Sequence, residues 1–252
     1  MADVGTVSIS YVTDPFCPWS WAAEPSWRRL QTEFGGEVSI TYVISGMGGA
    51  QPDPLEWLEV AAASGMPADP RGLMREPPAS TNPAGLAVKA VAEQADPGPF
   101  LRRLREAIFV DRRRVDRGDA LLDLARETSP ALDLDTLKVA FGSHGPVEAL
   151  GADFERAAGE PRPSLRIGAA TVDGRAPYAE WRAAVLAAGG VPRDVALDPE
   201  AALRRFGSCA TAEVAAACDL PGPRAPAALW RLALEWRVRP RAVLGGELWT
   251  LA

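Results

Sequence analysis

The residue of this chain best placed for chemistry is a cysteine at the start of a helical pattern. Cys17 follows residues 6–13, whose alternating apolar positions predict a strand, and precedes residues 18–34, whose apolar spacing predicts a helix. A thiol at a helix N-terminus lies beside unpaired N–H groups and the positive end of the helix dipole, and both favour the thiolate. We therefore expect Cys17 to be a nucleophile with a lowered pKa.

The fourth position of the same segment is a serine. A dithiol redox site has a cysteine at both ends of a Cys-x-x-Cys segment, whereas this chain reads Cys17-Pro18-Trp19-Ser20. Cys17 alone can attack a disulfide and form a mixed disulfide, but an external thiol must then release it. Two interpretations of Ser20 stay open: it donates a hydrogen bond that orients the thiolate, or it is simply a small residue that fits there.

Composition excludes several other classes of function. The chain has 252 residues, 47% of them hydrophobic, which is enough for one large core with an insertion and an appendage. The net charge of −6 gives no bulk attraction to nucleic acid or to an anionic membrane. Three distant cysteines, Cys17, Cys209 and Cys218, predict neither a disulfide framework nor a metal site. With no leader pattern and no apolar run of membrane length, we expect a cytoplasmic protein.

The apolar patterns predict an α/β domain over residues 1–190. Residues 38–44 alternate like 6–13, so the first forty residues indicate a strand–helix–strand unit with parallel strands. A proline-rich stretch at 67–83 should run over the surface, and residues 84–158 are periodic only as helices, so we predict an all-helical insertion over about 53–160.

Strands return at 163–167 and 170–172, and Asp173-Gly174 has the composition of a hairpin turn. Residues 191–252 predict three short helices and a hairpin around Gly245-Gly246. This is the layout of a winged helix, and we expect a small C-terminal module of that kind. Its third helix is sparsely basic, which argues against nucleic acid as a partner.

The segment from Asp14 to Pro25 resembles the DsbA-like branch of the thioredoxin superfamily, and more narrowly its FrnE-like and protease-adaptor subgroup. Three features recur in the family's order: the Cys-Pro motif at Cys17, a helical insertion, and a second proline, Pro163, before a strand. The resemblance implies a thioredoxin-like fold over about residues 5–190. It also makes Pro163 the counterpart of the family's cis-proline, which lies against the active-site cysteine.

The resemblance assigns roles around the thiol. It implies a catalytic set of Cys17, Ser20 and Pro163, with the backbone beside Pro163 holding an extended substrate. Residues flanking these three are the expected substrate-binding positions: Phe16, Pro18, Trp19, Arg162 and Ser164. We expect Trp19 at the rim of the site and Trp21 in the core.

Three functions follow from these observations. The first is thiol-disulfide exchange or thiol transfer through Cys17 on a disulfide- or thiol-bearing protein or small molecule. It needs no tightly bound cofactor, but it needs glutathione or another low-molecular-weight thiol for release. The second is a non-redox adaptor that binds a partner protein, since Ser20 is what we expect in a redox site that has lost its resolving cysteine. The third is an isomerase or glutathione-transferase-like enzyme acting on a small hydrophobic molecule. No membrane partner is expected, and a homodimer stays open.

Overall fold

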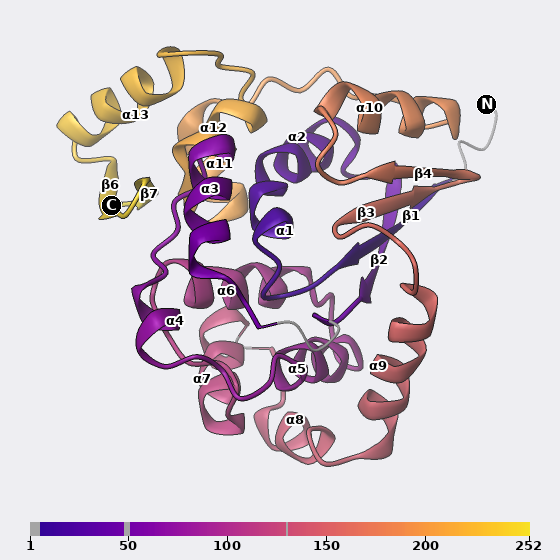
Figure 1. Cartoon of the computed structure of the whole chain (residues 1–252). Coiled ribbons are helices and arrows are strands. Elements are labelled where there is room, and N and C mark those ends of the chain that lie inside the picture. Colours follow the sequence, from indigo (N-terminus) through magenta and orange to yellow (C-terminus); the bar gives the residue numbers. More distant parts are fainter. Residues whose placement is uncertain (1–5, 48–50, 130) are drawn as a thin grey trace.

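The structure is a computed structural model that describes residues 6–47, 51–129 and 131–252. Its main sheet has four strands in the order β2-β1-β3-β4, with β1 (Val7–Thr13) at the centre. Strand β2 (Val38–Ile44) pairs with β1 in parallel, while β3 (Ser164–Ile167) and β4 (Ala170–Asp173) add in antiparallel fashion (Figure 1). This confirms the predicted α/β thioredoxin-like core and the parallel first pair.

The residues after Cys17 that were predicted as one helix, 18–34, form two helices. Helix α1 (Pro18–Ala22) ends at Ala23, and α2 (Glu24–Phe34) begins there with Pro25 in its first turn. Proline has no backbone N–H to continue the hydrogen bonds of α1, so the break falls before it. Helix α2 covers one face of the sheet, where Trp27 stacks on Tyr11 with ring centroids 4.6 Å apart.

Among the described residues between β2 and β3, every secondary-structure element is a helix, as predicted. These helices are α3 (Pro54–Ser64), α4 (Arg71–Arg75), α5 (Asn82–Ala92), α6 (Gly98–Phe109), α7 (Gly118–Thr128), α8 (Leu134–Ala140) and α9 (His144–Arg156). Figure 1 shows α5, α7, α8 and α9 grouped on the side away from α2 and α10 (Tyr178–Ala187), whereas α6 lies beside α1. In none of the described ranges is a helix both long and apolar enough to span a membrane.

Two sequence-based expectations about loops were wrong. The stretch at 67–83 does not run wholly over the surface, because residues 66–70 are buried. The N–H of Ala68 donates to the carbonyl of Leu244 over 3.1 Å, and the indole of Trp21 donates to the carbonyl of Pro67 over 2.9 Å. The C-terminal hairpin thus covers this stretch.

The turn between β3 and β4 lies at Gly168, not at Asp173-Gly174. Gly168 has a φ of +58°, which glycine adopts without strain. The Asp173-Gly174 pair instead follows β4 and leads toward α10. There the Asp173 carboxylate accepts a hydrogen bond from the N–H of Arg175 over 2.8 Å.

The C-terminal residues form a small unit with its own core. It consists of α11 (Pro199–Phe206), β5 (Cys209–Ala210), α12 (Thr211–Ala217), α13 (Arg224–Leu234), β6 (Val238–Val243) and β7 (Gly246–Leu251). Leu203, Val214, Leu229 and Trp249 are fully buried in this core. The three predicted helices and the hairpin are present, with β5 as an added strand in the order β5-β7-β6; the winged-helix class stays a prediction.

Candidate functional site

Cys17 is the N-cap residue of α1. Its backbone is extended (φ −72°, ψ 115°), Pro18 follows at the first helical position, and the N–H of Trp21 donates to the Cys17 carbonyl over 3.2 Å. Proline suits the first helical position because the N–H there has no intrahelical partner. The end of β1 and the start of α1 therefore place the thiol where the sequence predicted it. The cysteine is nevertheless only 5% exposed.

The loop that carries Pro163 lies beside the thiol. The Arg162–Pro163 peptide bond is cis, and the Cys17 Sγ lies 4.0 Å from the carbonyl oxygen of Arg162, to which it donates a weak hydrogen bond. Gly174 holds this loop, since its N–H donates to the Pro163 carbonyl over 2.8 Å. A Cβ at Gly174 would come within 2.5 Å of the Pro163 ring, so a larger residue would displace the loop.

Ser20 belongs to a chain of hydrogen bonds that ends near Cys17. The Arg105 guanidinium donates to the hydroxyl of Thr13, which donates to the hydroxyl of Ser20 over 2.9 Å. Hydrogen bonding by Ser20 in turn lowers the pKa of Cys17. Thr13 and Ser20 are completely buried and Arg105 is 1% exposed. Ser20 is therefore a positioned donor, which favours the first of the two interpretations given above.

The pKa of Cys17 departs from the expectation. Burial is the largest cause and raises the pKa of the thiol above its ordinary value. Hydrogen bonds from Ser20 and the charge of Arg105 act in the opposite direction without overcoming burial, and the nearby Asp14 carboxylate adds to the increase. The predicted lowering of the Cys17 pKa is thus wrong for this structure.

Asp14 is a second buried titratable group at the site. It is 1% exposed, and its carboxylate accepts a hydrogen bond from the N–H of Phe16 over 2.8 Å. Burial raises the pKa of Asp14 to about 6, although Phe16, Arg105 and Arg162 act to lower it. The site therefore has an acid that titrates close to neutrality.

Of the five predicted substrate-binding side chains, two offer an accessible surface. Trp19 is half-buried, donates to Glu56 over 3.0 Å and has the Arg175 guanidinium 5.7 Å from its ring centre. Arg162 is exposed, and its guanidinium donates to the carbonyl of Gly46.

The other three side chains are covered. Phe16, Pro18 and Ser164 are buried, and the Ser164 hydroxyl donates to Glu160 over 3.0 Å. A substrate could reach these positions only through their backbone. Their predicted roles, like those of Trp19 and Arg162, stay predictions. The sequence also predicts a mobile or tightly turned loop after β2 at Gly46-Met47-Gly48-Gly49, and the second half of this segment lies outside the described residues.

The two other cysteines cannot complete a dithiol site in this arrangement. Cys209 and Cys218 lie in the core of the C-terminal unit, away from the main core, and all three cysteines are free thiols. Within the described part of the chain, no cluster of three or more histidine, cysteine, aspartate or glutamate side chains could hold a metal ion.

A buried ionic network behind the site was not predicted from the sequence. Glu24 and Glu213 are 2% and 0% exposed, and three arginines surround them. Arg105 donates to Glu24 over 2.5 Å, while Glu213 accepts from Arg28 over 3.1 Å and from Arg102 over 2.8 Å. One sequence signal could have revealed it: Arg102 and Arg105 lie three residues apart, on the same helix face as the core residues of α6.

A family model described as Thioredoxin matches residues 11–159. The chain belongs to this thioredoxin family. Its curated relatives include the ClpXP adapter protein SpxH of Halalkalibacterium halodurans, which is 30% identical over 161 residues. That match covers 56% of this chain and 51% of the relative, so the chain spans about half the length of this relative.

Solved structures agree with the fold. Cytosolic disulfide reductase DsbM from Pseudomonas aeruginosa, solved with GSH, matches with a TM-score of 0.59 and 21% identity, over 71% of this chain and 98% of that one. A probable DsbA oxidoreductase from Streptomyces coelicolor matches with a TM-score of 0.61 and 17% identity, over 76% and 93%. The predicted thioredoxin-like fold is thus confirmed.

Proposed function

We propose that this protein is a non-redox binding protein of the adapter type, which binds a partner polypeptide and presents it to a ClpXP-type protease. The observation that carries the proposal is the presence of a buried serine, Ser20, at the fourth position of the Cys-Pro-Trp-Ser segment. It occupies the place of a second thiol, is completely buried, and accepts a hydrogen bond from Thr13 over 2.9 Å. A mixed disulfide formed at Cys17 would have no internal thiol to resolve it.

The state of the thiol supports the same proposal. A thiol with a pKa above about 8.5 has less than about 3% thiolate at pH 7, and the thiolate is the nucleophile. Burial raises the pKa of Cys17, and its side chain has little exposed surface for a disulfide to approach. The SpxH adapter of Halalkalibacterium halodurans, 30% identical, supports the adapter class. We place the protein in the cytoplasm, with which the cytosolic DsbM is compatible.

The proposed partner is a protein and not DNA. In a DNA-binding winged helix the hairpin would have to be free to contact the nucleic acid. Here the carbonyl of Leu244 at its tip accepts from Ala68, and Arg241 on β6 pairs with Asp111 at 2.5 Å and with Glu106 at 3.1 Å. In the docked hairpin the charge of Arg241 is thus offset by two carboxylates of the same chain, which weakens any attraction to phosphate.

A second candidate function is favoured by the cis-Pro163 loop. Cys17 lies at the N-cap of α1 and 4.0 Å from the carbonyl of Arg162. An extended disulfide-bearing substrate could pair with this backbone and be attacked by Cys17, with glutathione or another small thiol releasing it. The substrate's disulfide would be reduced and the external thiol oxidised. A glutathione-transferase-like or isomerase activity has no such specific contact in its favour.

One pair of measurements separates the two candidates. Binding of the purified chain to purified bacterial ClpX is measured by biolayer interferometry, for wild type and Cys17→Ser. In parallel, both proteins are incubated with glutathione disulfide at pH 7, and the mass added by any glutathione adduct is measured by intact-mass spectrometry. We expect both proteins to bind ClpX with affinities within about twofold, and little glutathione adduct on wild type. Absence of ClpX binding by wild type contradicts the adapter proposal, and a stoichiometric adduct that reduced glutathione releases supports the second candidate.

A further inference from the structure

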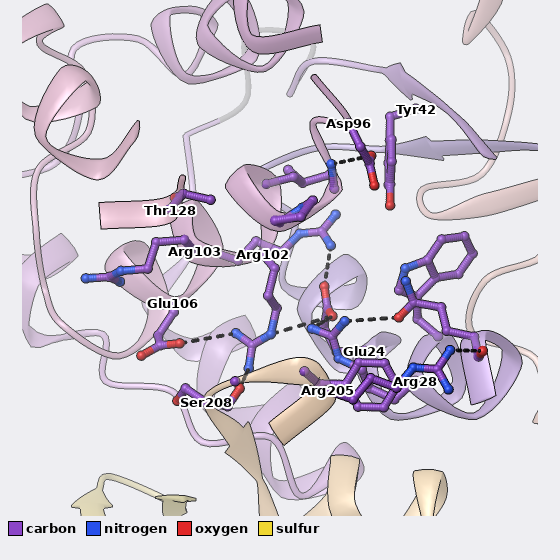
Figure 2. A pocket seen from close by; sticks show the side chains of 18 residues that line it. Glu24, Arg28, Tyr42, Asp96, Arg102, Arg103, Glu106, Thr128, Arg205 and Ser208 are labelled. Carbon is purple, nitrogen blue, oxygen red and sulfur yellow. Dashed lines mark hydrogen bonds and ion pairs between the residues drawn. The ribbon is translucent and has the colours of Figure 1, made fainter. Parts of the chain in front are cut away.

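A pocket of about 570 Å³ lies between α2, α6 and the segment that follows α11. Neither Cys17 nor Pro163 lines it, so it is distinct from the site described above. Its volume falls within the range of about 300–1,000 Å³ that is usual for small-molecule sites. Figure 2 shows Arg28 and Arg102 converging on Glu24 within it.

The lining is rich in guanidinium groups. Three carboxylates, Glu24, Asp96 and Glu106, face five arginines, which are Arg28, Arg102, Arg103, Arg105 and Arg205. Glu213 lies behind them and accepts hydrogen bonds from Arg28 and Arg102. Outside the pocket, Arg103 is neutralised by Asp111 and Glu127.

Arg102 has donor atoms that its neighbours do not satisfy. It is 8% exposed, and its Nη2 donates to Glu213 and to the carbonyl of Ser208. Its Nε and Nη1 are buried without a hydrogen-bond partner, and the carboxylates closest to them, Glu24 and Glu106, are 3.7 and 3.8 Å away. A buried donor without a partner destabilises the protein, and a bound acceptor would remove that cost.

Arg205 adds positive charge at the mouth of the pocket. It is exposed, donates to the carbonyl of Gln31 over 2.7 Å, and lies 5.0 Å from the ring centre of Phe206. No aspartate or glutamate among the described residues forms an ion pair with it. Partial burial of its guanidinium, and then the nearby charge of Arg193, lower the pKa of Arg205.

The rest of the lining combines apolar and aromatic side chains with the polar side chains of Gln31, Thr128 and Ser208. Trp27, Tyr42, Leu101 and Phe206 contribute to it. Planar guanidinium groups bind carboxylate and phosphate oxygens through paired hydrogen bonds, and flat apolar groups pack on aromatic side chains. The lining as a whole therefore matches a ligand with an anionic end and an apolar body.

We propose that this pocket binds a small organic anion that carries a carboxylate or phosphate group, and that Arg105 links its occupancy to Cys17 through Thr13 and Ser20. The link is the hydrogen-bond chain described above, in which Arg105 lines the pocket and also donates to Thr13. The charge of Arg105 lowers the pKa of Cys17. An anion bound beside Arg105 offsets that charge, so it raises the proportion of protonated thiol.

The binding test uses isothermal titration calorimetry on the full chain with phenyl phosphate and benzoate, at fixed ionic strength. Benzyl alcohol serves as the neutral counterpart. We expect saturable 1:1 binding of at least one of the two anions and none of benzyl alcohol; which anion binds more tightly identifies the headgroup. Arg205→Gln should weaken binding about tenfold, the effect of one lost charge-assisted hydrogen bond. Its matched control is Arg204→Gln, because Arg204 is exposed, pairs with Glu200 and does not line the pocket.

The result that would overturn the site is no saturable binding of either anion to wild type. Equal weakening by Arg205→Gln and Arg204→Gln would also overturn it, because it would mean general electrostatic attraction. These outcomes do not depend on ClpX or on redox chemistry, and the titration is repeated with Cys17→Ser, which should bind the anion as wild type does. The test of the site is therefore separate from the test of the proposed adapter function.

The link to Cys17 is tested by peptide-resolved alkylation. Saturating anion should slow the alkylation of Cys17 by iodoacetamide at pH 8 severalfold, and Thr13→Val, which breaks the hydrogen-bond chain but keeps the charge of Arg105, should diminish that effect while the anion still binds. Iodoacetamide is neutral, so the anion does not repel it directly. Binding without any change in the alkylation of Cys17 would overturn the link.

Discussion

The hydroxyl of Thr13 donates a hydrogen bond to the hydroxyl of Ser20 over 2.9 Å, and both side chains are completely buried. This pair connects the end of β1 to the first helix at the position where a dithiol site would have its second sulfur. Because Thr13 occupies an acceptor site of Ser20, the serine proton is available to Cys17, and hydrogen bonding by Ser20 lowers the thiol pKa. Ser20 therefore supports the thiol but cannot exchange a disulfide.

Replacing Ser20 by cysteine should create redox activity. In Ser20→Cys the second thiol lies on the first turn of α1 beside Cys17, and an internal thiol can resolve a mixed disulfide. We expect the variant to reduce insulin disulfides with dithiothreitol as the reductant, while wild type stays near the uncatalysed rate. Ser26→Cys adds a thiol on α2 instead and is the control. Activity above the uncatalysed rate in wild type, equal to that of Ser20→Cys, would show that Cys17 works alone, and no activity in Ser20→Cys would contradict the prediction.

Asp14 should make stability depend on pH. Its folded-state pKa of about 6 lies above the unfolded value of about 3.9, so the folded state holds the proton more tightly. The stabilisation of the folded state by this proton is fully present below about pH 4 and is lost as the pH rises through 6. Two pKa units correspond to about 3 kcal/mol. Relative to Asp14→Asn, whose side chain can still accept from Phe16, wild type should therefore lose about 2–3 kcal/mol of unfolding free energy between pH 4 and pH 7.5.

Urea denaturation of both proteins at several pH values checks this prediction. The comparison with Asp14→Asn removes the contributions of the other titrating groups, which the two proteins share. A difference in unfolding free energy that does not change between pH 4 and pH 7.5 would mean that Asp14 titrates normally.

Removing Glu213 should strongly destabilise the fold. This carboxylate accepts hydrogen bonds from Arg28, Arg102 and the N–H of Ala210, and it lies between the C-terminal unit and helices α2 and α6. Its loss leaves buried guanidinium charge uncompensated, which typically costs about 3–5 kcal/mol. We expect Glu213→Ala to lower the free energy of unfolding in urea by about that amount.

The matched control for Glu213 is Glu59→Ala, on the exposed face of α3. A surface change of this kind should alter stability by less than about 0.5 kcal/mol. A loss below about 1 kcal/mol in Glu213→Ala would indicate that the network is already solvated or that its arginines find other partners.

The local patterns of the sequence predicted the fold well. Alternating residues in β1 and β2, helical spacing in the insertion, and the Cys17 and Pro163 motifs in their order were enough to identify a thioredoxin-like domain, because each of these signals is carried by neighbouring residues. The corrections concern contacts between distant residues. No local pattern shows that Leu244 covers Ala68, or that Gly168 and not Gly174 makes the β3–β4 turn.

The candidate site was predicted in its residues but not in its electrostatics. Position at a helix N-terminus favours a lowered thiol pKa, and that much follows from sequence. Burial has the opposite effect, and how deeply Cys17 is buried depends on the Pro163 loop, 145 residues away. The partners of Arg102 and Arg105 likewise come from α2 and α12, so the ionic network could not be assigned before the elements were packed together.

The thiol of Cys17 is protonated at neutral pH, because burial raises its pKa. The most direct test is the rate of Cys17 alkylation by iodoacetamide from pH 5 to pH 10, followed by mass spectrometry of the peptide that contains Cys17 in the wild-type protein. Cys209 and Cys218 are then followed in the same sample and need no substitution. We predict a midpoint above about 8.5, the value of a free cysteine. A midpoint at or below pH 7 would contradict a raised pKa of Cys17 and would favour thiol-disulfide chemistry at this residue.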